Sequence, residues 1–191
     1  MSAMQNKTTP TVIALSRQGL PNLEASTAEK VLLGAYVVRE ATQGAHPQFI
    51  MVSSGAEVSL CMQAADVLDE AEVAHAAKKA RGQPKALQGS QIRVVSMPSW
   101  ELFDKQSMEY KRSIFPVGVP VLSVEAAATT GWEKYSHVQF GMTSFGMSGP
   151  NTKVYEHFGF VPSAVAEKAR KVAVHFSGKG VQAWPLLQEI I

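Results

Sequence analysis

Short apolar runs alternate with polar turns along the chain and predict a series of strands. The runs lie at residues 11–16, 36–40, 49–52, 92–97, 119–124 and 136–140. Residues 49–52 contain no polar side chain, which is typical of a central strand that is covered on both faces. Residues 136–140 are expected to form an edge strand.

Helical patterns lie between these runs. Ser54 and Glu57 have the spacing of a capping box, in which each side chain accepts from the backbone of the other residue. One face of the helix that follows is apolar and carries Val58, Cys61, Ala65 and Leu68. Asp104 is expected to cap a helix over residues 105–115, because an aspartate accepts hydrogen bonds from the first-turn amides.

The last part of the chain predicts two more helices. Asn151 is expected to cap a short helix that runs to Phe158 and ends at Gly159, and Ser163 is the candidate cap of the final helix. The inner face of that helix is made of Val165, Ala169, Val172 and Phe176. Strands that alternate with helices predict an α/β fold, with helices on both faces of a largely parallel sheet.

Composition narrows the class of protein. The 191 residues are 46% hydrophobic, enough for one full core, and a net charge of +2 without a basic cluster argues against nucleic acid as a partner. Because Cys61 is the single cysteine, no disulfide framework is possible, and a cytoplasmic location is expected. No apolar run approaches the roughly 20 residues of a membrane span.

Residues 71–91 contain glycines, a proline and several cations, which predicts an exposed insertion outside the core.

Several residues could take part in binding or catalysis. The turn at residues 53–56 could hold an anion at a helix start, but Glu57 in the first turn would satisfy the amides itself and repel phosphate. The histidines are scattered and form no metal-binding pair, so we expect His137 to have a structural role. Glu125 follows a strand where an acid or base could lie, but a hydrogen bond that anchors a loop is favoured. Arg17 could bind a phosphate or carboxylate with its forked guanidinium.

A set of motifs, in order along the chain, identifies a family. They are LSRQGLP at 15–21, Gly-Ala-Tyr at 34–36, SSGAEVSL at 53–60, RVVSMP at 93–98, FDKQSMEYKRSIFP at 103–116 and SVEAAATTGWEKYSHVQFGMTSFGMSG at 123–149. Together they resemble the C-terminal part of a transketolase, over residues 11 to about 176. The resemblance implies a three-layer domain with a mostly parallel, mixed sheet of about five strands, one of them antiparallel.

The resemblance also implies a division of the chain. Residues 1–30 would comprise a tail, the last strand of the pyrimidine-binding domain and a linker; residues 31–180 would form the transketolase C-terminal domain, with the 71–91 insertion; residues 181–191 would be a tail. Transketolases transfer a two-carbon ketol unit between sugar phosphates with thiamine diphosphate and a divalent metal, Mg²⁺ or Ca²⁺. By this resemblance Arg17 binds the substrate phosphate, and the glycine-rich segment after Glu125 shapes contacts with the remaining domains or the second subunit of a homodimer.

The motifs that bind the cofactor in this family do not occur in these 191 residues. We therefore expect this chain alone to be inactive, with no catalytic, cofactor-binding or metal-binding residue of its own, and to support the structure of the enzyme. Two alternatives stay open at this point. One is the C-terminal domain of a dihydroxyacetone synthase, and the other is a separate non-catalytic module that binds an anion through Arg17 or the Ser54 turn.

Overall fold

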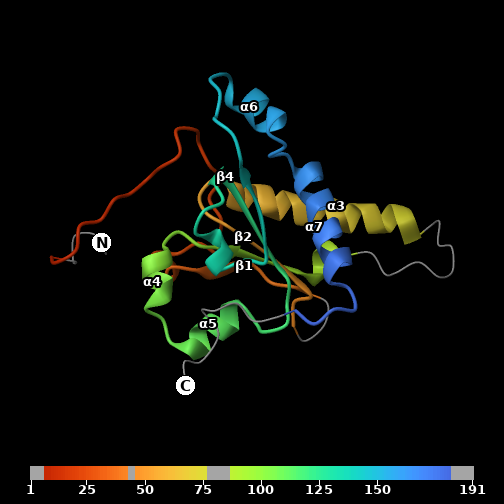
Figure 1. Ribbon diagram of the computed structural model, residues 1–191, viewed down its shortest axis with the longest axis horizontal. Coiled ribbons are helices and arrows are strands. Elements are labelled where there is room, and N and C mark those ends of the chain that lie inside the picture. The colour runs from red at the N-terminus through yellow and green to blue at the C-terminus, as the bar shows by residue number, and fades with distance from the viewer. Residues whose placement is uncertain (1–6, 43–45, 77–86, 182–191) are drawn as a thin grey trace.

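The computed structural model describes residues 7–42, 46–76 and 87–181 and shows a five-stranded mixed sheet (Figure 1). The strands are β1 (Tyr36–Arg39), β2 (Phe49–Ser53), β3 (Ile92–Ser96), β4 (Val121–Ala128) and β5 (Val138–Met142). Their order across the sheet is β1-β3-β2-β4-β5, and only the β1–β3 pair among them is antiparallel. The α/β fold and the mostly parallel sheet predicted from the sequence are confirmed.

The central position of β2 explains its composition. It pairs in parallel with β3 on one side and β4 on the other, and every residue of the strand is buried. A strand covered on both faces needs apolar side chains on both, so its sequence is a continuous apolar run instead of an alternating one. The edge position expected for residues 136–140 is also confirmed, since β5 pairs with β4 alone in the described sheet.

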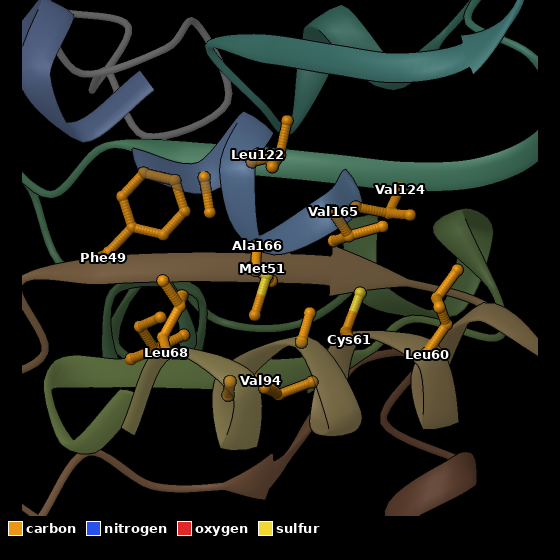
Figure 2. Packing of buried hydrophobic residues seen from close by; sticks show 14 of the residues in the cluster. Phe49, Met51, Leu60, Cys61, Leu68, Val94, Leu122, Val124, Val165 and Ala166 are labelled. Atoms are coloured by element: carbon orange, nitrogen blue, oxygen red, sulfur yellow. The ribbon is translucent and has the colours of Figure 1, made fainter. Parts of the chain in front are cut away.

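Two long helices cover one face of the sheet. They are α3 (Glu57–Ala76) and α7 (Pro162–Phe176), which lie against each other and against the strands (Figure 1). Figure 2 shows the core between them, where Phe49 and Met51 of β2 and Leu122 of β4 face Cys61 of α3 and Val165 of α7. Burial of these apolar side chains is the main force that holds both helices on the sheet.

Short helices and aromatic side chains cover the opposite face. The helices are α4 (Trp100–Asp104) and α5 (Met108–Ile114), and the cluster includes Ile50, Val52, Val95, Phe103, Phe115, Trp132 and Tyr135. The helix expected over residues 105–115 is present as α5, but it begins only at Met108, and the expected cap by Asp104 is wrong. Ser99 caps α4 and Ser107 caps α5, each by accepting a hydrogen bond from an amide three residues on. Asp104 is instead the last residue of α4, and its carboxylate is engaged by Tyr135 and Lys134.

The two helices near the C-terminal end begin without side-chain caps. In α6 (Asn151–His157), Asn151 is the first helical residue and Pro150 stands at the cap position, so the predicted cap by Asn151 is wrong. Val161 precedes Pro162 at the start of α7, so Ser163 is not a shifted cap either. A proline in the first turn costs no hydrogen bond, because the first-turn amides have no partner inside the helix.

The N-terminal run at residues 11–16 does not form a strand. Its apolar side chains are exposed, with 93% of Val12 and 86% of Leu15 open to solvent. A β-strand needs a neighbouring strand for its backbone groups, and within the described residues none lies beside this segment. A short helix, α2 (Ala28–Val31), then leads into β1.

The end of the predicted insertion at 71–91 belongs to the core. Residues 71–76 continue α3, and residues 77–86 lie outside the described residues. Residues 89–91 form the turn η1 (Gly89–Gln91), and Gln88, Gly89 and Gln91 are buried. A β-carbon on Gly89 would lie 2.0 Å from the carbonyl oxygen of Ala65, so this turn packs directly on α3. The prediction that the whole segment stands outside the core is therefore wrong for residues 88–91.

Candidate functional site

The candidate site begins where β2 and β4 end side by side. Glu125, in β4, accepts hydrogen bonds from the backbone nitrogen of Ser54 at 3.1 Å and from Ser54 Oγ at 2.9 Å. The expected capping box is wrong, because the Glu57 amide donates to the Ser54 carbonyl oxygen at 3.2 Å and not to the Ser54 hydroxyl, which itself donates to a carboxylate 71 residues away. The turn after β2 is tied to the neighbouring strand, which confirms the loop-anchoring role expected for Glu125.

Glu57 lies beside this pair in the first turn of α3 and is 4% exposed. Burial, and next the charge of Glu57, raise the pKa of Glu125 to about 7, although the hydrogen bonds from Ser54 oppose the change. Glu125 therefore keeps its proton up to about pH 7. With these carboxylates in place, the turn at residues 53–56 does not offer the positive environment that an added phosphate needs.

Tyr155 connects α6 to the carboxyl pair. Its hydroxyl donates to Glu57 Oε1, and burial together with this bond raises the pKa of Tyr155. The ring centroids of Tyr155 and Phe160 are 5.8 Å apart, and Phe160 in turn stacks on Phe140 of β5 at 4.8 Å. The hydroxyl of Tyr155 is thus held at a fixed place on the surface of the domain.

The N-terminal segment reaches the same place. Ser16 Oγ lies 3.9 Å from the position that a β-carbon would take on Gly55, in the turn after β2. Burial raises the pKa of the Tyr155 hydroxyl, and the nearby side chain of Gln18, which is half-buried, partly lowers it. Between these two residues, Arg17 is exposed.

Arg17 and Gln18 line an open depression of about 530 Å³. Its other wall is made of the glycine-rich loop and the start of α6, with Met147, Gly149, Pro150, Asn151 and Val154. Within the part of the chain that the structure describes, no carboxylate forms an ion pair with Arg17. Its guanidinium is therefore available to an anion, which could accept two parallel hydrogen bonds from it.

A second open depression, of about 330 Å³, has Glu125 in its wall. The remaining lining includes Ser54, Met97, Trp100, Glu101 and Trp132. The rings of Trp100 and Trp132 meet edge to face at 5.2 Å. Two glutamates in the lining, with no lysine or arginine, make this depression unsuited to an anion.

His137, His157 and His175 contribute to packing through ring contacts with phenylalanines. His137 Nδ1 accepts a hydrogen bond from the backbone nitrogen of Val121 at 3.0 Å, and its ring meets that of Phe176 at 5.6 Å, which confirms the structural role expected for it. In the ranges 7–42, 46–76 and 87–181, no group of three or more His, Cys, Asp or Glu side chains could hold a metal ion.

The structure brings several sequence candidates together. Ser54, Glu57 and Glu125 form one cluster, and Ser16, the neighbour of Arg17, lies near the turn at Gly55. Sequence reasoning did not include Tyr155 or Gln18 in the site. No local pattern could have found Tyr155, because its partner Glu57 is 98 residues away. Among the described helices, none is long and apolar enough to cross a membrane.

The fold and the site together define an α/β domain whose parallel strands end at an anchored carboxylate pair beside an exposed arginine. Residues 34–161 match the family model described as the transketolase-like TK C-terminal domain. The chain belongs to the transketolase family, and this part of it is the C-terminal domain of that family.

Known transketolases are similar in sequence to nearly the whole of this chain. The chain is 42% identical to a transketolase of Kluyveromyces lactis over 94% of its own length and 23% of the relative's. It is 42% identical to transketolase 1 of Saccharomyces cerevisiae over 93% of its length, again 23% of the relative's. A crystal structure of Pichia stipitis transketolase in complex with sedoheptulose 7-phosphate matches with a TM-score of 0.75 and 39% identity over 92% of this chain and 23% of that one. The chain thus spans about a quarter of the length of these relatives.

Proposed function

We propose that this chain supplies the C-terminal part of a transketolase, which transfers a two-carbon ketol unit between sugar phosphates, and that Arg17 binds the phosphate of the substrate. The observation that carries the proposal is the exposed guanidinium of Arg17 at an open depression, with no ion-pair partner among the described residues. A phosphate there would form charge-assisted hydrogen bonds with the guanidinium. The family membership of the chain supports the class of substrate.

We assign the cofactor chemistry to the parts of the enzyme that these 191 residues do not contain. Thiamine diphosphate, with Mg²⁺ or Ca²⁺, would supply the electron sink for the transfer of the two-carbon unit. This chain would hold the substrate phosphate and support the remaining domains in a cytoplasmic homodimer. In this proposal residues 1–30 include a strand that joins the sheet of the preceding domain, and residues 31–180 form the C-terminal domain.

The exposed apolar run at residues 11–16 supports this division. Val12 and Leu15 lie almost fully open in the described structure, although such β-branched and aliphatic residues favour a paired strand. Pairing with a sheet outside these residues would bury them and would fix the backbone just before Arg17. The arginine would then stand where two domains meet, which is a common place for a substrate site.

The test compares substrates with and without a phosphate in the full-length enzyme that carries this domain. Arg17→Ala should raise KM for the sugar phosphate roughly 10- to 100-fold and leave KM for the same sugar without phosphate nearly unchanged. Lys171→Ala, which removes an exposed cation from α7, serves as the matched control and should change neither value. Equal effects of Arg17→Ala on both substrates would contradict the phosphate role.

A further inference from the structure

We infer that the loop between β5 and α6, residues 143–150, docks on the domain that precedes this one in the full-length enzyme, with Phe145 as its anchor. This inference rests on the proposed function, because it takes the chain to be the C-terminal part of a longer transketolase. The partner is an apolar surface of the same polypeptide. Docking would close the depression at Arg17 from a second side.

The loop is exposed over its whole length within the described structure. Residues 143–153 are all exposed, and Phe145 leaves 99% of its surface open, with 52% for Met147. A β-carbon on Gly146 would meet no described atom within 4 Å, so nothing packs against the middle of the loop there. A fully exposed phenylalanine contributes nothing to the stability of this domain, whereas its burial at an interface is favourable.

The composition of the loop is typical of an interface. Residues 143–152 contain no Asp, Glu, Lys or Arg, although all of them face solvent. Charged residues are common at protein surfaces but are depleted at the buried centre of an interface, where phenylalanine and methionine are enriched. Phe145 and Met147 supply these apolar side chains two positions apart. The loop therefore fits an apolar partner surface and not a charged ligand.

The helix that follows the loop holds it in place. None of the residues of α6 is buried, and the loop and α6 project from the end of the sheet in Figure 1. The hydrogen bond from the Tyr155 hydroxyl to Glu57 ties α6 to the start of α3. A projection that is anchored before docking loses little conformational freedom when its tip is buried.

The N-terminal segment identifies the partner. Met147 and Gly149 line the same depression as Arg17, which directly follows the exposed apolar run at residues 11–16. The chain matches the C-terminal domain of its family and spans about a quarter of the length of its relatives, so the full-length polypeptide enters this domain through that run. The preceding domain therefore lies within reach of the loop. A second subunit has no covalent link to this end of the sheet.

Docking would change the surroundings of Arg17. Val12 and Leu15 are exposed on one side of it, and Met147 is exposed on the other side, across the depression. If one domain covers both apolar sides, the open depression becomes a pocket between two domains, which is a common place for a substrate site. Exclusion of water from this pocket would strengthen the attraction between the guanidinium and an anion.

A photo-crosslinker at position 145 of the full-length enzyme tests the docking. Phe145→p-benzoylphenylalanine keeps an aromatic side chain, and irradiation should join it to the preceding domain while the product keeps the mass of one chain. Peptide mass spectrometry locates the crosslink. The matched control is Val117→p-benzoylphenylalanine, because Val117 is 56% exposed and precedes β4. Since β4 and β5 are parallel, it lies at the opposite end of the sheet from the loop and should give no crosslink to the preceding domain.

The other results of irradiation would overturn the proposal. A product of twice the chain mass would show that the second subunit covers the loop. Crosslinks confined to residues 1–191, or none at all, would show that the preceding domain does not cover Phe145.

A second measurement needs no variant. Chymotrypsin should cleave after Phe145 at least about tenfold faster in the 191-residue chain than in the full-length enzyme, because the loop is covered only in the enzyme. Mass spectrometry of the fragments over time gives both rates. Equal rates would contradict the docking.

The docking and the phosphate role can fail separately. A crosslink from position 145 to the preceding domain, together with no phosphate-specific effect of Arg17→Ala, would keep the docking and remove the phosphate role. A phosphate-specific effect of Arg17→Ala without a crosslink beyond residues 1–191 would preserve the proposed function and remove the docking.

Discussion

The carboxyl group of Glu125 and the hydroxyl of Ser54 lie 2.9 Å apart and join the ends of two neighbouring parallel strands. The same carboxyl group also accepts from the Ser54 backbone nitrogen and faces Glu57. This one residue therefore sets the position of the turn on which Ser16 lies, and its protonation state affects the whole domain.

We predict that Glu125 makes the stability of the domain fall as the pH rises through the range from about 4.5 to 7. Its pKa is about 7 in the folded chain, above the usual 4.5, chiefly because of burial and next because of the Glu57 charge. The folded state therefore keeps a proton that the unfolded chain releases in this window. The free energy of unfolding should fall by up to about 3 kcal/mol across it.

Urea unfolding at pH 4.5 and pH 8 measures this effect. Glu125→Gln keeps an oxygen that can accept from Ser54 and cannot ionise, so it should lose less stability than the wild type between these pH values. Glu109→Gln changes the same group at an exposed position on α5 and should behave like the wild type. The prediction is wrong if the Glu125→Gln protein has the same pH dependence as the wild type.

The strands could be predicted from the sequence because a strand that is covered on both faces consists of a continuous run of apolar residues. Residues 49–52 are apolar throughout and residues 119–124 are apolar except for Ser123, since both faces of β2 and the first half of β4 are covered, and this pattern needs no knowledge of the partner strand. The run at residues 11–16 is also rich in apolar residues but has no neighbouring strand among the described residues. Composition alone therefore predicted a strand that these residues do not form in this structure.

The site was harder to predict because its bonds join distant parts of the chain. Ser54 and Glu57 have a local capping pattern, yet each side chain bonds to a residue 71 or 98 positions away, Ser54 to Glu125 and Glu57 to Tyr155. A long-range carboxylate or hydroxyl competes with the local amide for each group. Local spacing cannot decide that competition, whereas the resemblance of LSRQGLP to its family did single out Arg17.

We predict that Cys61 does not react with thiol reagents in the folded protein. It is fully buried between α3 and the sheet, and this burial raises the pKa of the thiol to about 12, so almost no thiolate exists at neutral pH. Labelling with a chromogenic disulfide should appear only after urea is added. In the variant Ser163→Cys, the added thiol is exposed at the start of α7 and should react at once. Rapid labelling of the wild type without urea would contradict the prediction.

We predict that Gly34→Ala destabilises the domain much more than Gly118→Ala. Both glycines have a left-handed backbone, with φ of 82° and 86°, so each alanine costs about 1 kcal/mol in strain. At Gly34 the new β-carbon would also lie 2.2 Å from the backbone nitrogen of Phe103, which forces α4 to shift, whereas at Gly118 nothing lies within 4 Å. The total loss at Gly34 should be roughly 2 to 5 kcal/mol. Urea unfolding of both variants tests this, and equal losses would refute it.

We predict that the hydroxyl of Tyr135 stabilises the fold more than the ammonium of Lys134, although both bind Asp104. The Tyr135 hydroxyl donates to Asp104 Oδ1 at 2.8 Å from a ring that is 1% exposed, whereas the Lys134 side chain is 45% exposed. Tyr135→Phe should lower the free energy of unfolding by about 1 to 2 kcal/mol, since a buried hydrogen bond to a charged group is lost. Lys134→Met should cost less than about 1 kcal/mol, as expected for an ion pair in contact with water.

Because both partners share one carboxylate, the double variant should differ from the sum of the single losses in urea unfolding. A larger loss for Lys134→Met than for Tyr135→Phe would show that the ion pair, and not the buried hydroxyl, holds α4 against the turn at Tyr135.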